Sequence, residues 1–130
     1  MLDHVGFQVA DFARSKAFYA KALAPLGISL LFEVGAEQTG NSAHAGFGEH
    51  GKAYFWIGES AGPVRTRALH VCFAAESRRV VEEFHAAAMA AGGRDNGAPG
   101  LRPHYHADYY GAFVLDPDGH NIEAVCRLPG

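Results

Sequence analysis

The chain opens with a regular alternation of apolar and other positions. Residues 2–9 are predicted as a strand. From residue 4 on, every second residue is apolar and the others are polar or glycine, which places Val5, Phe7 and Val9 on one side and His4, Gly6 and Gln8 on the other. This period of two is typical of a β-strand with one face in a core. Asp11 then provides the side chain of a helix N-cap, and a helix is predicted over residues 14–26, where Pro25 and Gly27 end it.

Three more strands are predicted in the first half of the chain. Residues 28–34, 43–47 and 53–57 are rich in branched and aromatic side chains, as strands are. Residues 35–42 are expected to form a polar turn. The Gly, Ser and Pro of residues 58–66 predict a connector. The first half therefore gives a strand, a helix and three strands.

The second half repeats the first at an offset of 66 residues. Residues 68–73 match residues 2–7, and the same offset relates the two predicted helices, pairing Phe18 with Phe84 and Ala22 with Ala88. A constant offset over a strand and a helix indicates duplication of one supersecondary unit. We therefore expect a single domain, residues 1–130, with an α+β fold built from two modules that span residues 1–58 and 67–130.

The pattern of the second module has one irregular stretch. Residues 69–75 alternate as a strand, and Ser77 is the expected N-cap of a helix that ends at Gly92. Residues 93–111 show no clear period. Strand patterns return in residues 112–115 and 120–127, on either side of an Asp-Pro-Asp-Gly turn that is a strong hairpin signal.

Composition excludes some classes of partner. The chain has 130 residues, of which 48% are hydrophobic and 19% charged, a balance that suits one folded domain. A net charge of −3 without a basic run argues against nucleic acid and against anionic membrane surfaces. The apolar stretches are too short to cross a bilayer. Without a signal-peptide pattern or a disulfide framework, we expect a cytoplasmic protein in which Cys72 and Cys126 are reduced and buried.

Three side chains are candidate metal ligands. His4 and His70 hold equivalent positions in the two repeats, each opposite the packing side of its strand, and Glu123 lies inside an otherwise apolar strand. Burying Glu123 without a partner would cost several kcal/mol, so it must face water or a positive charge. Two imidazoles and a carboxylate can bind a divalent metal and leave positions open for a substrate. The alternative is that all three are ordinary solvated or hydrogen-bonded residues.

The irregular stretch carries a second group of candidates. Arg102 could bind a substrate carboxylate, His106 or Tyr105 could act as acid or base, and Tyr109 could contact the substrate. The alternative is that these side chains pack the loop onto the sheet.

Elsewhere, two residues are candidate substrate contacts. Gln8, on the side of His4, could hydrogen-bond a ligand, and Phe55 could form a pocket wall or belong to the core. His44 and His85 have no inferable partner and are expected to face solvent.

The chain resembles the vicinal oxygen chelate superfamily, which includes glyoxalase I, the extradiol dioxygenases, and the bleomycin and fosfomycin resistance proteins. The resemblance covers nearly the whole chain. It is carried by Asp-His-Val-Gly-Phe-Gln-Val at residues 3–9 and, more specifically, by Phe-Val-Leu-Asp-Pro-Asp-Gly-His-Asn-Ile-Glu at residues 113–123. It implies two βαβββ modules whose curved mixed sheets enclose a central cleft, and a homodimer. It also implies one divalent metal per site, Fe, Zn, Ni or Mn, bound by His4, His70 and Glu123.

The resemblance leaves the reaction open. Glyoxalase I has a fourth ligand in the last strand of its first module, and aligning Gly51 with Gly119 puts Phe55 there, which cannot coordinate a metal. The remaining set resembles the dioxygenase branch, although the chain is half the length of a two-domain extradiol enzyme. We expect a metal-dependent lyase, isomerase or dioxygenase that acts on a small oxygen-rich molecule. The alternative is a non-enzymatic drug-binding protein of the bleomycin-resistance type.

Overall fold

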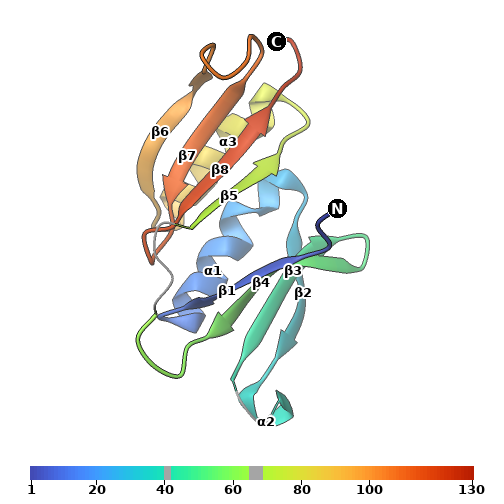
Figure 1. Ribbon diagram of the computed structural model, residues 1–130, viewed down its shortest axis with the longest axis vertical. Coiled ribbons are helices and arrows are strands. Elements are labelled where there is room, and N and C mark those ends of the chain that lie inside the picture. Colours follow the sequence, from blue (N-terminus) through green and yellow to red (C-terminus); the bar gives the residue numbers. More distant parts are fainter. Residues whose placement is uncertain (40–41, 65–68) are drawn as a thin grey trace.

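Two four-stranded mixed sheets, each covered by a helix, make up the protein (Figure 1). The computed structural model describes residues 1–39, 42–64 and 69–130. The first sheet has the order β1-β4-β3-β2, formed by β1 (Val5–Val9), β2 (Ser29–Val34), β3 (His44–Glu49) and β4 (Lys52–Glu59). The second has the order β5-β8-β7-β6, formed by β5 (His70–Ala74), β6 (Arg94–Leu101), β7 (Tyr110–Leu115) and β8 (Asn121–Cys126).

The two sheets share one topology, which confirms the expected α+β fold of two modules. In each sheet the first strand of the module runs parallel to the last, and the other pairs are antiparallel. The connector partly lies outside the described residues. So do residue 67, where the second module was expected to begin, and Ala68 of the repeat.

The two long helices begin where their N-caps were predicted. The Asp11 carboxylate accepts a hydrogen bond from the Arg14 N–H at 3.1 Å, and α1 (Phe12–Ala22) follows it directly. The 3₁₀ turn η1 (Ala24–Leu26) then ends at Gly27. Ser77 caps α3 (Arg78–Ala90) in the same way. None of the helices in the described part of the chain has the length and apolar character of a membrane span.

Two local expectations need correction. The stretch without a clear period contains β6, an edge strand whose pairing with β7 shifts register on both sides of Gly97. Glycine and proline in this strand interrupt the alternation, which is why the pattern missed it. The expected polar turn contains the short helix α2 (Ala36–Thr39), and residues 40–41 lie outside the described part.

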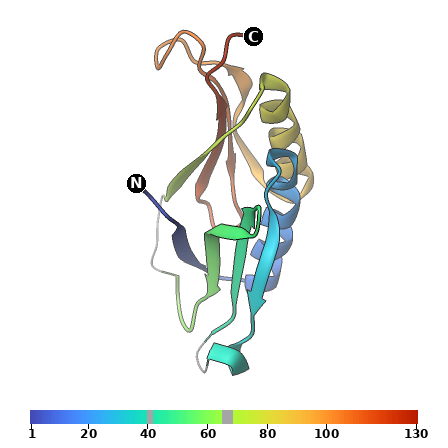
Figure 2. The same ribbon diagram turned by 90° about the vertical axis from the view of Figure 1, so that its right-hand side faces the viewer.

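One hydrophobic core runs through both modules. Helices α1 and α3 lie on the same side of the two sheets and pack against each other (Figure 2), and buried Phe18 and Phe84 belong to one cluster. Phe55 is fully buried, with ring centroids of core aromatics 4.9–6.1 Å away: Phe7, Tyr19, Phe47 and Phe73. The structure thus places Phe55 in the shared core.

The modules are also joined by polar contacts. The Tyr19 hydroxyl of α1 donates to Asp116 Oδ2 at 2.5 Å, and Asp116 Oδ1 accepts from the N–H groups of Asp118 and His120. The backbone N–H of Ala10 in turn donates to Asp118. The Asp-Pro-Asp-Gly turn therefore both closes a hairpin and docks the second module on the first.

Candidate metal and substrate site

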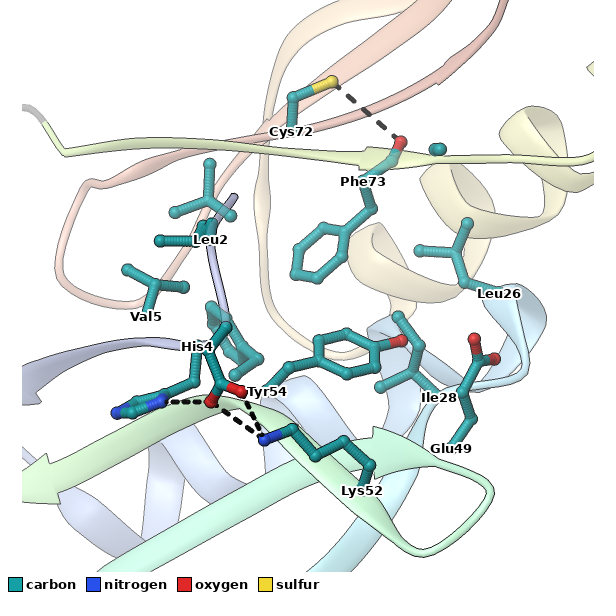
Figure 3. Close-up of a pocket in the computed structure, with 14 residues that line it drawn as sticks. Leu2, His4, Val5, Leu26, Ile28, Glu49, Lys52, Tyr54, Cys72 and Phe73 are labelled. Atoms are coloured by element: carbon teal, nitrogen blue, oxygen red, sulfur yellow. Dashed lines mark hydrogen bonds and ion pairs between the residues drawn. The ribbon is translucent and has the colours of Figure 1, made fainter.

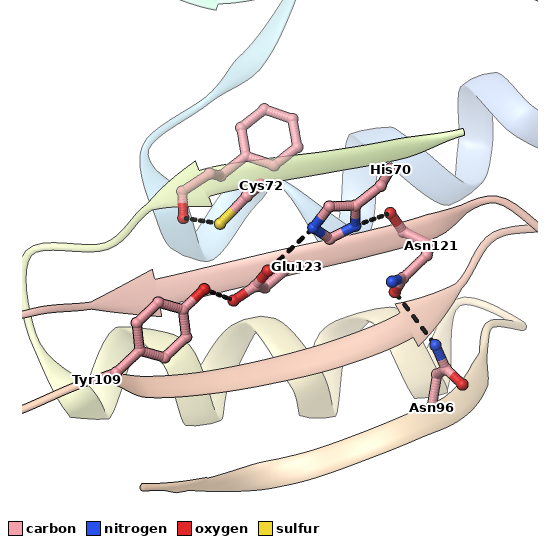
Figure 4. Close-up of polar contacts among 7 residues, drawn as sticks. His70, Cys72, Asn96, Tyr109, Asn121 and Glu123 are labelled. Carbon is pink, nitrogen blue, oxygen red and sulfur yellow. Dashed lines mark hydrogen bonds and ion pairs between the residues drawn. The ribbon is translucent and has the colours of Figure 1, made fainter. Parts of the chain in front are cut away.

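His70 and Glu123 meet on the open face of the second sheet (Figure 4). His70 Nδ1 lies 3.0 Å from the carbonyl oxygen of Asn121, and Nε2 lies 3.1 Å from Glu123 Oε1. A carbonyl oxygen only accepts, so Nδ1 carries the hydrogen and Nε2 of the neutral ring presents a lone pair. This lone pair faces a carboxylate oxygen. Two acceptor atoms at this distance need a cation between them, which can be either a proton or a metal ion.

The Glu123 carboxylate is held from its other side by Tyr109. Glu123 is only 2% exposed, and the Tyr109 hydroxyl donates to its Oε2. Burial, helped by the bond to Glu123, raises the pKa of Tyr109 above its usual range, so this hydroxyl remains a donor. The Arg127 guanidinium lies over the Tyr109 ring, 4.9 Å from its centroid. The result is a carboxylate with one fixed oxygen and one facing His70.

The two cysteines differ in their surroundings. Cys126 is buried, as expected, whereas Cys72 lies exposed beside Glu123. Partial burial of the thiol and the charge of Glu123 raise the pKa of Cys72 to about 12. Cys72 is therefore a neutral thiol near neutral pH in the metal-free protein.

Around the His70–Glu123 pair lies an open cleft of about 390 Å³, lined by His70, Tyr105, Tyr109, Phe113, Asn121, Glu123 and Arg127. Tyr105 is 61% exposed and packs its ring against that of Tyr109, with 5.1 Å between centroids. The cleft of the second sheet thus combines two side chains that can bind a metal, His70 and Glu123, with the positive charge of Arg127 and the phenol of Tyr105.

The first sheet presents a separate pocket of about 450 Å³, which includes His4 and Gln8. His4 Nδ1 lies 2.7 Å from Asp3 Oδ1, and Lys52 Nζ binds both oxygens of the same carboxylate (Figure 3). Lys52 and His4 together hold the pKa of Asp3 below its usual range. The carboxylate keeps the hydrogen of His4 on Nδ1, which leaves Nε2 as the ligand atom of the neutral ring.

His4 does not join the other two candidate ligands within one copy of the chain. Across residues 1–39, 42–64 and 69–130, no three His, Cys, Asp or Glu side chains gather as a metal-binding group. A cavity of about 460 Å³ between the modules has His4 and Lys52 on one side and Cys72 and Phe73 on the other (Figure 3). Strands β1 and β5 belong to different sheets, and the equivalent positions of His4 and His70 in the repeat lead to separate pockets.

The loop candidates divide into two pairs. Tyr105 and Tyr109 line the cleft of the second sheet. The Arg102 guanidinium instead donates to the carbonyls of Ala98 and Gly100, both at 2.8 Å, and lies over the Phe113 ring. His106 Nδ1 accepts from the backbone N–H of Asp108 at 3.1 Å, within the loop itself. The contacts of Arg102 and His106 fix the loop.

Sequence reasoning missed two residues that line these pockets. Arg127 follows Glu123 by four positions, so continued strand alternation predicts the same face. His44 was expected in solvent, but it is half-buried, with Nδ1 2.9 Å from the Ser42 carbonyl oxygen, and it lines the pocket of His4. His85 also has a partner, Asp95, at 3.0 Å.

The alignment that compared Phe55 with Glu123 is shifted by one residue. In the second sheet Cys72 pairs with Glu123, and in the first sheet the equivalent Gly6 pairs with Trp56. A register irregularity in the β3–β4 pair, at Phe47 and Gly48, accounts for the shift. Trp56 therefore occupies the position of Glu123, and it too cannot coordinate a metal.

Comparison with known proteins agrees with this architecture. Residues 1–124 match the family model described as the Glyoxalase/Bleomycin resistance protein/Dioxygenase superfamily. A glyoxalase/bleomycin resistance protein from Albidiferax ferrireducens is 30% identical with a TM-score of 0.75, over 98% of this chain and 99% of that one. No curated protein gave a significant match.

Two more distant structures share the fold. A mutant of glyoxalase I from Zea mays is 24% identical with a TM-score of 0.74, over 95% of this chain and 46% of the maize chain. A mutant fosfomycin resistance protein from Listeria monocytogenes, complexed with Mn(II) and 1S,2S-dihydroxypropylphosphonic acid, is 19% identical with a TM-score of 0.68, over 96% of this chain and 90% of that one. With its two modules and a family match across nearly its whole length, the chain belongs to the glyoxalase/bleomycin resistance protein/dioxygenase superfamily.

Proposed function

We propose that the protein is a metal-dependent enzyme in which a divalent cation, held by His70 and Glu123, chelates two oxygens of a small substrate. The contact that carries the proposal is the 3.1 Å approach of His70 Nε2 to Glu123 Oε1. This distance is short enough for both atoms to bind one divalent cation, since their bonds to a metal are about 2.0–2.2 Å long. An imidazole and a carboxylate also suit Fe, Zn, Ni or Mn.

The third ligand in this proposal is His4 of a second copy. Catalytic metal sites use about three protein ligands and leave the remaining positions for substrate. His4 is the repeat equivalent of His70, and Asp3 fixes its Nδ1 as Asn121 fixes that of His70. Such hydrogen bonds orient ligand histidines. The active unit would be a homodimer in which the first sheet of one copy lies opposite the second sheet of its partner.

The surrounding side chains would then divide the work. When bound at His70 and Glu123, the metal would supply Lewis acidity, which would stabilise negative charge that develops on the substrate. Tyr109 orients Glu123, and Arg127 adds positive charge to the same cleft. Tyr105, exposed in the cleft, is the candidate acid or base. Lyase, isomerase and dioxygenase reactions all use such an arrangement. The Listeria protein, which has the same fold, is complexed with Mn(II) and 1S,2S-dihydroxypropylphosphonic acid, and this supports the proposal.

The test is metal binding by untagged protein, stripped with a chelator and titrated with Mn(II) and Zn(II). Wild type is expected to bind one ion per chain, and His70→Ala to weaken binding by more than about 100-fold, since it removes a ligand outright. His50→Asn is the matched control, because it removes a histidine from a turn where φ is 52° and asparagine is tolerated. Equal binding by wild type and His70→Ala would overturn the proposal. Absence of binding by wild type would do the same, and would favour a His70–Glu123 ion pair and a drug-binding role.

A further inference from the structure

Two rings lie directly over glycines on the open face of the first sheet. Strands β3 and β4 pair His44 with Gly58 and Gly46 with Trp56. A Cβ at Gly58 would lie 3.0 Å from Cδ2 and 3.1 Å from Nε2 of His44, and one at Gly46 would lie 2.7–2.8 Å from atoms of the Trp56 indole. These distances are below normal contact, so the missing side chains make room for the rings.

The His44 ring is oriented by its hydrogen bond. Nδ1 lies 2.9 Å from the carbonyl oxygen of Ser42, which can only accept, so the hydrogen is on Nδ1. Nε2 of the neutral ring is then an acceptor, and it lies over Gly58, the register partner of Gln8. The pocket of about 450 Å³ therefore has an oriented hydrogen-bond acceptor among its lining residues.

Aromatic surface borders this acceptor. The Trp56 indole is half-buried and nearly parallel to the Phe32 ring, with 11° between planes and 6.3 Å between centroids. Phe32 is 47% exposed. A planar ligand gains dispersion and stacking energy on such a surface, which an aliphatic ligand of equal size matches poorly.

We propose that this pocket binds a flat ring that carries an O–H or N–H donor on its edge, with the ring against Trp56 and the donor on Nε2 of His44. The acceptor selects for the donor, because a site built to hydrogen-bond a group discriminates against analogues that lack it. His4 lines the same pocket, so the inference rests on the proposed function and adds a substrate class to it. His44 is the specificity-determining residue.

The test uses the fact that Trp56 is the single tryptophan of the chain. In ¹⁵N-labelled full-length protein freed of metal with a chelator, the one indole N–H resonance reports on the pocket. Titration with phenol is expected to shift it saturably, and anisole, the same ring with the donor methylated, to bind about tenfold more weakly, as the loss of one hydrogen bond implies.

The variants decide between selection by His44 and simple stacking. His44→Ala should bring phenol and anisole to equal affinity, whereas Gly46→Ala should weaken both because the indole must move. Gly62→Ala is the matched control, since a Cβ there meets open space, and it should behave as wild type. Equal affinities in wild type, a tenfold preference that survives His44→Ala, or no indole shift would each overturn the inference. Because no metal is present, these outcomes are independent of the His70→Ala metal titration.

Discussion

Each oxygen of the Glu123 carboxylate has its own neighbour. Oε2 accepts the Tyr109 hydroxyl, and Oε1 faces His70 Nε2. A hydrogen bond on one oxygen limits rotation of the group and leaves the other oxygen free for the proposed cation. Groups that orient a ligand in this way contribute to metal affinity without touching the metal.

Replacing Tyr109 with phenylalanine tests this positioning role. Tyr109→Phe removes the donor from a carboxylate that is 2% exposed, so Oε2 loses its partner and the group can rotate. We expect Mn(II) and Zn(II) affinity to fall by about 10- to 100-fold, measured by calorimetric titration. Tyr105→Phe is the control, because Tyr105 contacts Tyr109 through its ring and is largely exposed. Equal affinities for Tyr109→Phe and wild type would rule out the role.

At the scale of single residues, the sequence predicts strand side chains better than loop side chains. Alternation along a strand fixes the direction of every second side chain, which is how the pattern placed His70 opposite the packing side of its strand. Arg102 carries the charge that suits a substrate carboxylate, yet its guanidinium donates to the carbonyls of Ala98 and Gly100 in β6. Those contacts depend on backbone dihedrals that no periodicity encodes.

At the scale of elements, helix α1 and the β7–β8 turn are joined by a buried hydrogen bond. Tyr19 is fully buried, and its hydroxyl donates to Asp116, which is 2% exposed. Burial and the Asp116 charge raise the pKa of Tyr19 well above its usual range. The neutral phenol is thus the form that the fold favours.

The expected effect of Tyr19→Phe is a loss of about 1–3 kcal/mol of unfolding free energy near neutral pH, since it leaves a buried carboxylate oxygen without its donor. A raised folded-state pKa gives stability that is complete below the unfolded pKa of about 10 and is lost above it. The difference in unfolding free energy between wild type and Tyr19→Phe should therefore become smaller as the pH rises past 10. Urea denaturation at several pH values measures this, with Tyr105→Phe, at a position that is 61% exposed, as the control. A gap that stays constant would contradict the assignment to Tyr19.

The elements themselves show where sequence patterns stop being informative. Helix starts were predictable because Asp11 and Ser77 cap through their own side chains. Strand β6 was not, because its shape comes from pairing with β7 across two register shifts. The one-residue error in comparing β4 with β8 has the same origin, since a bulge changes which residue faces the cleft without changing the hydrophobic pattern.

At the scale of the whole molecule, the two sheets share one topology but carry different side chains on their open faces. The pocket on the first sheet is lined by His4, His44 and Trp56. The pocket on the second sheet is lined by His70, Glu123 and Tyr109. Helices α1 and α3 and a common core hold the two modules together. The open face of each sheet has its own pocket. If a partner copy supplies the opposite face, each dimer contains two complete sites, each built from two chains.

Mixing two variants that each lack one proposed metal ligand tests this arrangement directly. In a heterodimer of His4→Ala and Glu123→Gln, one site loses both His4 and Glu123. The other site keeps His4 from one copy and the His70–Glu123 pair from its partner. Random pairing of equal amounts should therefore restore about a quarter of the wild-type metal sites. The matched control mixes His70→Ala with Glu123→Gln: these residues share one half-site, so each site of that heterodimer still lacks one ligand and no binding returns. Recovery in neither mixture, with dimers confirmed by light scattering, would mean that all the ligands of a site come from one copy.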